Sequence, residues 1–389
     1  MKKTLPTFLL TVVILLGLGI VLLPSASILQ AQRHYKGDSF AFFLLQAKWL
    51  IVAIGVGIAC CMFDYHRWKK YLPFSAPFYV FIAFLLLLTL LPGIKREING
   101  SYRWLQLGSL PSFQPGEFAK LAIVIMTAVW LNSVGWRVRQ FWRGAVVPAA
   151  LVGTLALLLL LEKDYGALMV VGVLGSALMF VAGTNLWHLL ALAAPGVALL
   201  TVKVLQDKTR LTRITDWWKV VVTGDTHDVG DAAHHLEQSI LAFKIGGLEG
   251  SGLNKSIQKQ IYLPESHTDF IFAIGGEELG FFFSIAVLAC YLMLLICGIL
   301  ISIRAPDRLG RLLAFGMIML LVFQGTFNIA VVTGLVPTKG LALPFISYGG
   351  TNLITALFAV GTLFNIGMHV DVHDERMHTK VVRDAINTV

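Results

Sequence analysis

A cluster of ionisable side chains lies where a long polar segment of the chain runs into a strongly apolar stretch. Its members are Lys259, Glu265, His267, Asp269, Glu277 and Glu278. A lipid bilayer tolerates charges at such a boundary only where they are paired or face water, so they mark candidate functional sites. Asp269 stands at the boundary itself and is the strongest single candidate. The structural alternative is a helix cap, because Thr268 and Asp269 directly precede the apolar run.

The composition is that of an integral membrane protein. Of the 389 residues, 57% are hydrophobic and only 14% are charged, and the mean hydropathy is +0.76. A soluble domain carries about a quarter charged residues. The net charge of +9 does not indicate nucleic-acid binding, because the basic residues lie in short segments between apolar runs. All four cysteines fall inside apolar runs, which favours small hydrophobic residues over disulfides or metal ligands.

Ten apolar runs are long enough to cross a bilayer, which predicts an all-α integral membrane protein with one polytopic domain, residues 1–389. They lie at about 7–26, 41–62, 72–92, 117–135, 143–161, 166–183, 186–205, 270–302, 311–336 and 346–370. A long loop, 206–269, separates the seventh run from the eighth. Only residues 183–185 separate the sixth from the seventh, which predicts a tight hairpin. The eighth run exceeds one straight span, so we expect its helix to tilt or protrude.

The lysine and arginine residues of the short connecting segments predict the orientation. With the N-terminus inside, fourteen of them lie on the inner side and seven on the outer side. An excess of basic residues in short loops marks the cytoplasmic side of polytopic proteins. We therefore expect both termini in the cytoplasm and the 206–269 loop outside. Arg103, Asp164, Asp269 and the segment 337–348 then share the outer face.

Glu117 and Lys120 lie near the start of the fourth predicted helix. Pro115 at the first helical turn and Glu117 just after it are typical of a helix N-terminus, where an acidic residue complements the helix dipole. This explains Glu117 but not Lys120, which is three residues further on and faces the same way. The pair is either structural or a contact to an anionic lipid headgroup.

Five basic residues open the long outer loop: Lys203, Lys208, Arg210, Arg213 and Lys219. They form either a solvated face whose stems reach along the membrane surface or a phosphate-binding group. Trp217 and Trp218 among them are typical of a membrane interface.

Two glycine-rich segments lie on the same outer side. Residues 246–256 resemble a phosphate-binding P-loop only superficially, because Lys255 does not directly follow the last glycine and no buried strand precedes it. The glycines and prolines between Gly334 and Gly350 exclude one regular helix there. Irregular backbone at membrane depth must be buried in protein or line a cavity.

Four ordered motifs together resemble the SEDS family (shape, elongation, division and sporulation), over nearly the whole chain. They are Gln114-Pro-Gly-Glu-Phe-Ala-Lys120, Tyr262-Leu-Pro-Glu-Ser-His-Thr-Asp-Phe-Ile-Phe272, Glu277-Glu-Leu-Gly280, and Gly334-Leu-Val-Pro-Thr-Lys-Gly340 with Leu343-Pro-Phe-Ile-Ser-Tyr-Gly-Gly350. Pro337-Thr-Lys-Gly340 is closer to the division-type branch, FtsW, than to the elongation-type branch, RodA.

The resemblance implies a peptidoglycan glycosyltransferase of the bacterial cytoplasmic (inner) membrane that polymerises lipid II for the division septum. It also implies a class B penicillin-binding protein as partner. The catalytic aspartate of the family corresponds to Asp269, and the glutamate and lysine of its fourth helix correspond to Glu117 and Lys120.

The chemistry that this implies needs a base and a set of cations. A carboxylate must take the proton of the acceptor sugar hydroxyl, and cations must stabilise the departing polyprenyl pyrophosphate. We assign the base to Asp269. The expected substrate-binding residues are Arg103, Lys120, Arg210, Arg213 and Lys259, with Glu117 positioning Lys120 and Glu278 in the same group. A divalent cation, Mg²⁺ or Mn²⁺, is the only cofactor expected, and no organic cofactor is.

Other function classes stay open at this level. A lipid II flippase or other transporter would also use interrupted helices and intramembrane charges. The concentration of ionisable residues on the outer side argues against it, with Lys48 as the main exception. The remaining alternatives are an elongation-type polymerase of the side wall and a non-catalytic scaffold for a cell-wall synthase.

Overall fold

The computed structural model describes the backbone of residues 1, 3–34, 38–70, 72–91, 101–106, 112–224, 230–261, 263 and 266–387. Glu265, named above, lies outside these residues, as do Lys36, Lys95 and Arg96, three of the seven basic residues counted on the outer side. Within them the regular elements are all helices, and a single bridge between Leu105 and Phe113 is the one β-type pairing.

The helices follow one another in a simple order along the chain. They are α1 (Thr4–His34), α2 (Ala41–Met62), α3 (Arg67–Lys70), α4 (Leu72–Leu90), α5 (Pro115–Val134), η1 (Gly135–Arg139), η2 (Phe141–Val146), α6 (Val147–Leu161), α7 (Tyr165–Val181), α8 (Leu186–Gln206), α9 (Lys208–Trp217), η3 (Trp218–Thr223), α10 (Asp231–Gly246), α11 (Gln258–Ile261), α12 (Ile271–Arg304), α13 (Arg308–Val332) and α14 (Gly350–Asn387).

The expectation of a helical membrane protein is confirmed. Eight described helices are long and apolar enough to cross a bilayer, and α4 and α7 are shorter apolar helices that fall on two further predicted runs. The tight hairpin is also present: α7 ends at Val181, and Asn185 caps α8 by accepting a hydrogen bond from the Trp187 amide at 3.0 Å.

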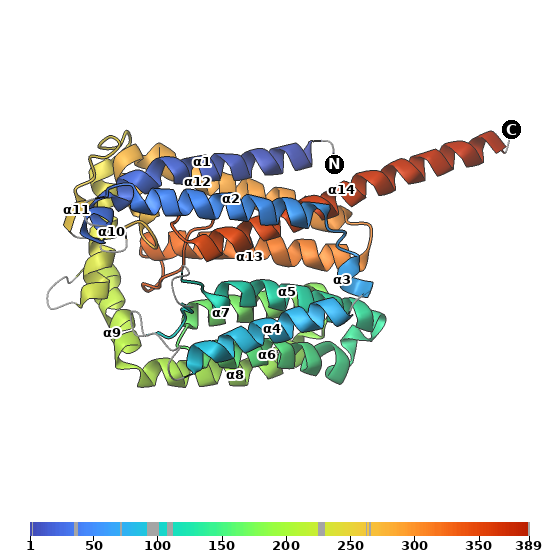
Figure 1. The fold of residues 1–389 in the computed structure, drawn as a ribbon. Helices are drawn as coiled ribbons and strands as arrows, with labels where there is room; N and C mark the ends of the chain where they lie inside the picture. The colour runs from blue at the N-terminus through green and yellow to red at the C-terminus, as the bar shows by residue number, and fades with distance from the viewer. Residues whose placement is uncertain are drawn as a thin grey trace.

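The helices form two groups that lie side by side. One contains α1, α2, α12, α13 and α14, and the other contains α4, α5, α6, α7 and α8 (Figure 1). The helix α13 packs against α5 and α7, so it joins the two groups. The helix α8 buries none of its side chains. Both termini lie at one end of the bundle, and α9, α10 and α11 lie at the other, here called the loop end (Figure 1).

Most of the predicted long loop is helical. Its segments α9, η3, α10 and α11 cross the loop end, and two hydrogen bonds tie them to the last turn of α13. Trp217 Nε1 donates to the Gly334 carbonyl at 2.8 Å, and Ser239 Oγ donates to the Val332 carbonyl at 2.7 Å. The basic side chains of α9 are therefore held above the segment that follows α13.

The long apolar run 270–302 is one helix with a break. Gly280 has φ 75° and ψ −165° within α12, a conformation that only glycine adopts readily. Phe281 N donates to the Gly247 carbonyl, and Ser251 N donates to the Glu277 carbonyl, both at 2.9 Å. The glycine-rich segment 246–252 therefore packs its backbone into the break. The expected excess length is accommodated by a separate first segment, residues 271–279.

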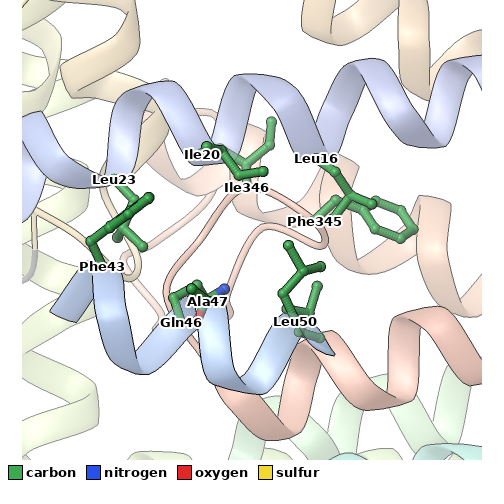
Figure 2. A pocket seen from close by; sticks show the side chains of 11 residues that line it. Leu16, Ile20, Leu23, Phe43, Gln46, Ala47, Leu50, Phe345 and Ile346 are labelled. Carbon is green, nitrogen blue, oxygen red and sulfur yellow. The ribbon is translucent and has the colours of Figure 1, made fainter. Parts of the chain in front are cut away.

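The segment between α13 and α14 is irregular, as its glycines and prolines predict. It enters the bundle beside α1, where a Cβ at Gly19 would come within 2.6 Å of the Phe345 carbonyl. An apolar groove lies here between α1, α2 and this segment, with Leu16, Ile20, Leu50 and Phe345 among its lining residues (Figure 2). The backbone of residues 337–349 is thus held against the helices rather than exposed as a surface loop.

Candidate active site

Asp269 lies in the turn that leads into α12 at the loop end. The N-cap position of α12 is occupied by Phe270, so Asp269 lies one residue before the position that the capping alternative gave it. Asn328 Nδ2 of α13 instead holds the turn by donating to the Asp269 carbonyl at 2.8 Å and to the Leu341 carbonyl at 2.6 Å. A Cβ on Gly340 would overlap Asp269 Oδ2. The carboxylate therefore lies directly against the backbone that follows Lys339.

Four cations gather beside Tyr165 and Asp164 at this end of the molecule: Arg103, Arg210, Arg213 and Lys339, here called the outer cation cluster. Arg210 Cζ and Lys339 Nζ each lie 5.2 Å from the centroid of the Tyr165 ring. Cations within about 6 Å of a ring centroid, over its face, are attracted by the ring. The cluster brings together side chains from segments far apart in the sequence.

Asp269 lies within electrostatic range of this cluster. The pKa of the Arg213 guanidinium lies below its usual range because of burial and of repulsion by Arg210 and Arg103, and the carboxylates of Asp207 and Asp269 oppose this shift. The structure therefore brings the predicted base and three of the predicted cations, Arg103, Arg210 and Arg213, to one place. The sequence predicts only that these residues share the outer face of the membrane, and not that they lie close together.

Buried donors in the outer cation cluster lack acceptors. Arg103 Nε and Arg210 Nε are both buried and have no hydrogen-bond partner among the described residues, and Arg210 Nε has only an ion-pair contact, with Asp207 Oδ2 at 3.8 Å. A buried charged donor without an acceptor costs free energy, about 1–3 kcal/mol or more. An anion placed between them would satisfy these groups, which is the usual chemistry of an arginine-lined phosphate site.

Asp164 is the counter-ion built into the cluster. Burial would raise the pKa of its carboxyl, but Arg103, the Ala167 amide, Lys339 and Lys120 outweigh burial and hold the pKa below its usual value. Its oxygens accept from Gln114 Nε2 at 3.0 Å and from the Ala167 amide at 3.1 Å. Asp164 is therefore charged and hydrogen-bonded to the protein, and its single negative charge offsets only part of the positive charge around it.

Lys339 is a site residue that the sequence argument did not assign. Burial and the neighbouring Arg210, Arg103 and Arg213 lower its pKa to about 7, although Asp164 partly opposes this. In the sequence, the Pro337-Thr-Lys-Gly340 motif that contains it serves only to distinguish the division-type branch from the elongation-type branch. The signal that could have found it is the adjacent Gly340, since the glycine allows the backbone at Lys339 to approach Asp269.

Glu117 and Lys120 form the predicted pair. Lys120 Nζ donates to Glu117 Oε1 at 2.7 Å and to Gln324 Oε1 at 2.7 Å, and both charged side chains are buried. Gln324 Nε2 then donates to the Ala342 carbonyl and to Asn352 Oδ1, each at 3.0 Å. The pair thus connects α5 through α13 to the irregular segment that carries Lys339 and Gly340.

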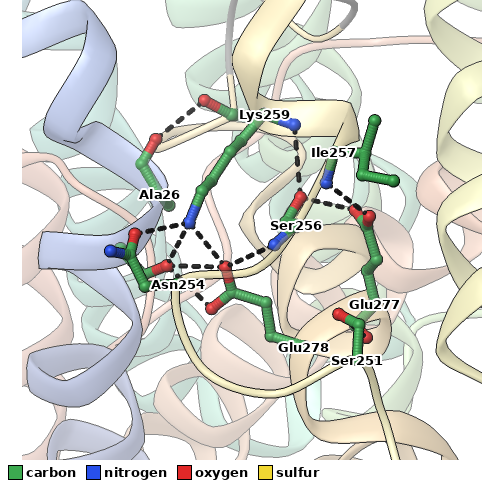
Figure 3. A network of polar contacts seen from close by, with 10 residues as sticks. Ala26, Ser251, Asn254, Ser256, Ile257, Lys259, Glu277 and Glu278 are labelled. Carbon is green, nitrogen blue, oxygen red and sulfur yellow. Dashed lines mark hydrogen bonds and ion pairs between the residues drawn. The ribbon is translucent and has the colours of Figure 1, made fainter.

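Lys259 and Glu278 belong to a separate buried network (Figure 3). Lys259 Nζ donates to Ser25 Oγ at 2.8 Å, to Asn254 Oδ1 at 2.8 Å and to Glu278 Oε1 at 2.7 Å. An ammonium group has three donors, so these contacts use all of them. Glu277 lies alongside and accepts from the Ile257 amide at 2.7 Å. Substrate contact by Lys259 and Glu278 stays a prediction, since their described contacts fix α1 and α11 to α12.

Comparison with known proteins places the chain in a family. The sequence model of the FtsW/RodA/SpoVE family, described as cell cycle proteins, matches residues 6–372. The chain belongs to this family. It is 38% identical over 362 residues to a probable peptidoglycan glycosyltransferase FtsW of Geobacter sp. (strain M18), covering 92% of this chain and 95% of that protein. It is 37% identical over 374 residues to the stage V sporulation protein E of Bacillus subtilis, covering 95% and 98%.

Solved structures of the family have the same fold. One, described as showing structural coordination of polymerization and crosslinking by a peptidoglycan synthase complex, has a TM-score of 0.73 at 25% identity and covers 93% of this chain and 97% of that one. The rod shape determining protein RodA of Thermus thermophilus has a TM-score of 0.64 at 26% identity, covering 93% and 95%. The resemblance drawn from the four motifs is therefore confirmed.

Proposed function

We propose that this protein is a peptidoglycan glycosyltransferase that polymerises lipid II during cell division. The observation that carries the proposal is the outer cation cluster beside Asp269, in which two buried guanidinium nitrogens make no hydrogen bond to the described residues. Relatives named as probable FtsW glycosyltransferases, which match most of this chain, support the same activity and its division-type branch.

The reaction follows from these groups. Asp269 takes the proton of the acceptor sugar hydroxyl as its oxygen attacks the anomeric carbon of the donor, and the bond from that carbon to the pyrophosphate oxygen breaks. Arg103, Arg210, Arg213 and Lys339 stabilise the negative charge that grows on the departing pyrophosphate. Asp269 then releases its proton to solvent.

A divalent cation, Mg²⁺ or Mn²⁺, would be held by Asp269 together with phosphate oxygens of the substrate. Mg²⁺ is commonly bound by one or two protein carboxylates plus substrate phosphates. Each oxygen of Asp164 accepts one protein hydrogen bond and keeps a second lone pair, so Asp164 is a further carboxylate near the site. Bound there, the ion would add charge stabilisation to that of the cluster.

Ten transmembrane spans with both termini in the cytoplasm are part of the proposal, and the 206–269 segment then faces the lipid-linked substrate outside. The basic residues of the short loops support this orientation, and both termini lie at one end of the bundle. Cysteines introduced at Thr223 and Gln140, both exposed, test it. In cells whose inner membrane is intact, a membrane-impermeant thiol reagent should label Thr223→Cys and not Gln140→Cys. Labelling of Gln140→Cys would show that the orientation is the reverse of the one proposed.

A class B penicillin-binding protein is the proposed partner, because a glycan strand must be cross-linked after it is made. The similar structure of a peptidoglycan synthase complex supports this. We also propose that residues 1–389 form one polytopic domain, in which the loop-end helices and the spans act together.

Polymerisation of purified lipid II by the purified protein, with and without the partner, tests the activity. Asp269→Asn should abolish glycan products, because the amide keeps the size of the side chain but cannot accept the proton. Glu249→Gln, an exposed carboxylate at the same end, is the matched control and should keep its activity. Translocation of lipid II without polymer formation by the wild-type protein would favour a transporter instead.

A further inference from the structure

A second group of ionisable side chains lies at the end of the bundle that carries the termini, far along α2, α13 and α14 from the site described above. Asp64 and His66 lie in the turn between α2 and α3, and His369 lies on α14. One ligand atom from each residue can be chosen so that all three lie within 4.8 Å of one another. In the described part of the chain, this is the one such cluster of three or more metal-type ligands.

The distances match the inner coordination shell of a small metal ion. His66 Nδ1 lies 2.7 Å from Asp64 Oδ1, and His369 Nε2 lies 3.7 Å from the same oxygen. Zinc held at about 2.0–2.1 Å by imidazole nitrogens and carboxylate oxygens in a tetrahedral site places its ligand atoms about 3.3 Å apart. The two observed distances lie on either side of that value and differ from it by about 0.6 Å and about 0.4 Å, so movements of this size in the exposed side chains would form the shell.

The outer nitrogen of His369 has the hydrogen-bond partner that a metal-bound histidine needs, whereas that of His66 lies near a carboxylate but beyond hydrogen-bond distance. His369 Nδ1 lies 2.9 Å from the Asn365 carbonyl, which can only accept, so this nitrogen carries the proton and Nε2 is left for a metal. His66 Nε2 lies 4.0 Å from Asp307 Oδ1. A carbonyl or carboxylate behind each ring is the arrangement that orients metal-ligating histidines and raises their basicity.

Tyr65 holds these groups in place. Its ring is buried, stacks on His66 with centroids 4.1 Å apart, and meets His369 edge-on at 5.3 Å. Its hydroxyl donates to Asp307 Oδ1 at 2.7 Å, and its amide donates to Asn365 Oδ1 at 3.1 Å. The ligands themselves stay accessible, since the side chains of Asp64, His66 and His369 are 45%, 40% and 33% exposed.

Asp64 already holds the first of these ligands in place. Its Oδ1 accepts from the His66 amide at 2.9 Å and lies 2.7 Å from His66 Nδ1. Cations must be bound by deprotonated carboxylates, and binding also releases the proton of His66 Nδ1 to solvent.

We propose that Asp64 Oδ1, His66 Nδ1 and His369 Nε2 form a binding site for a divalent first-row transition metal, with Zn²⁺ the best match. Imidazole and carboxylate ligands suit Zn²⁺, and three protein ligands leave a fourth position for water. Asp307 and the Asn365 carbonyl are its outer partners. The bound ion would cross-link the turn after α2 to α14.

Metal binding by the full-length chain tests the proposal. The protein, purified without a polyhistidine tag and stripped with a chelator, is dialysed against Zn²⁺ and its metal content is measured by mass spectrometry. We expect one Zn²⁺ per chain, bound at least about 100-fold more weakly by His369→Ala and by Asp64→Asn. His188→Ala removes a histidine from the first turn of α8 and should bind Zn²⁺ as the wild type does.

Co²⁺ gives an independent readout of the ligands. Its visible absorption should show tetrahedral coordination by nitrogen and oxygen in the wild type, and should disappear in His66→Ala. Thiolate charge-transfer bands would place the ion on Cys60 or Cys61 and overturn the assignment. The proposal is also overturned if the wild type binds no stoichiometric Zn²⁺, or if His369→Ala, folded by size-exclusion profile, binds it with unchanged affinity.

Discussion

The backbone of Gly340 lies directly against the carboxylate of Asp269, with no room between them for a side chain. The two residues come from separate segments of the chain, one before α12 and one after α13. Asn328 of α13 joins those segments by donating to the Asp269 and Leu341 carbonyls. The position of the proposed base is therefore fixed by a segment that carries one of its proposed cationic partners, Lys339.

Gly340→Ala should impair catalysis while leaving the protein folded. The added methyl group would displace the Asp269 carboxylate, and a misplacement of about 1 Å can cost about 100-fold in rate. We expect polymerisation of lipid II to fall at least about tenfold. Gly349→Ala, in the same segment, places its Cβ at an ordinary 3.6 Å from Asn352 Cβ and should be nearly as active as the wild type. Equal activities of the two variants would contradict the steric argument.

Glu117 and Lys120 should behave as one unit. Both are buried and joined at 2.7 Å, so removing either leaves an uncompensated charge, at a cost of about 3–5 kcal/mol. Glu117→Ala, Lys120→Ala and the double variant should lose thermal stability and activity non-additively, with the double variant less affected than the sum of the single changes. Additive losses in polymerisation rate and melting temperature would show that the two residues act separately.

The lowered pKa of Lys339 predicts that substrate binding depends on pH. Its pKa of about 7 means that it loses its proton as the pH rises through neutrality, and only the protonated amine attracts pyrophosphate. The apparent KM for lipid II should therefore rise about tenfold from pH 6 to pH 8. Lys339→Arg stays charged over this range, so its KM should vary less. If KM depends on pH in the same way in the wild type and in Lys339→Arg, then Lys339 is not the group whose titration controls substrate binding.

Lys259→Ala should destabilise the fold more than it weakens substrate binding. The change would leave Glu278, which is almost fully buried, without its cation. We expect a large drop in melting temperature in detergent, and partial recovery in the double variant Lys259→Met with Glu278→Gln, which removes both charges. A normal melting temperature with a raised KM for lipid II would instead support the substrate contact predicted from the sequence.

Much of the fold could be predicted because hydrophobic length and turn residues are local properties. The apolar runs coincide with helices, and the hairpin at residues 183–185 depends on a glycine and a helix cap that stand next to each other in the chain. The break in α12 could not be predicted. It depends on the backbone of residues 246–252 packing against Gly280, a contact that no pattern within the apolar run reveals.

The candidate site could be predicted only where it depends on local features of the sequence. Asp269 and the arginines of α9 were found from charge at a membrane boundary, and Glu117 with Lys120 from helical spacing. The motif that carries Lys339 was noted, but its proximity to Asp269 depends on Asn328 and on the path of the segment after α13. Lys259 is expected from its sequence position to contact substrate, but in the structure its ammonium group donates to acceptors within the protein. The sequence does not show which acceptors surround a basic residue.

The break in α12 also has a consequence for how the chain assembles. Gly280 adopts its conformation while the amide of Phe281 donates to Gly247, and Gly252 N donates to the Glu278 carbonyl at 3.0 Å. Without residues 246–252 in place, those groups of α12 would be unpaired in an apolar setting, and a continuous helix would be the more stable state. The end of α12 nearest Asp269 and the segment after α10 therefore depend on each other for their native structure and form one cooperative unit.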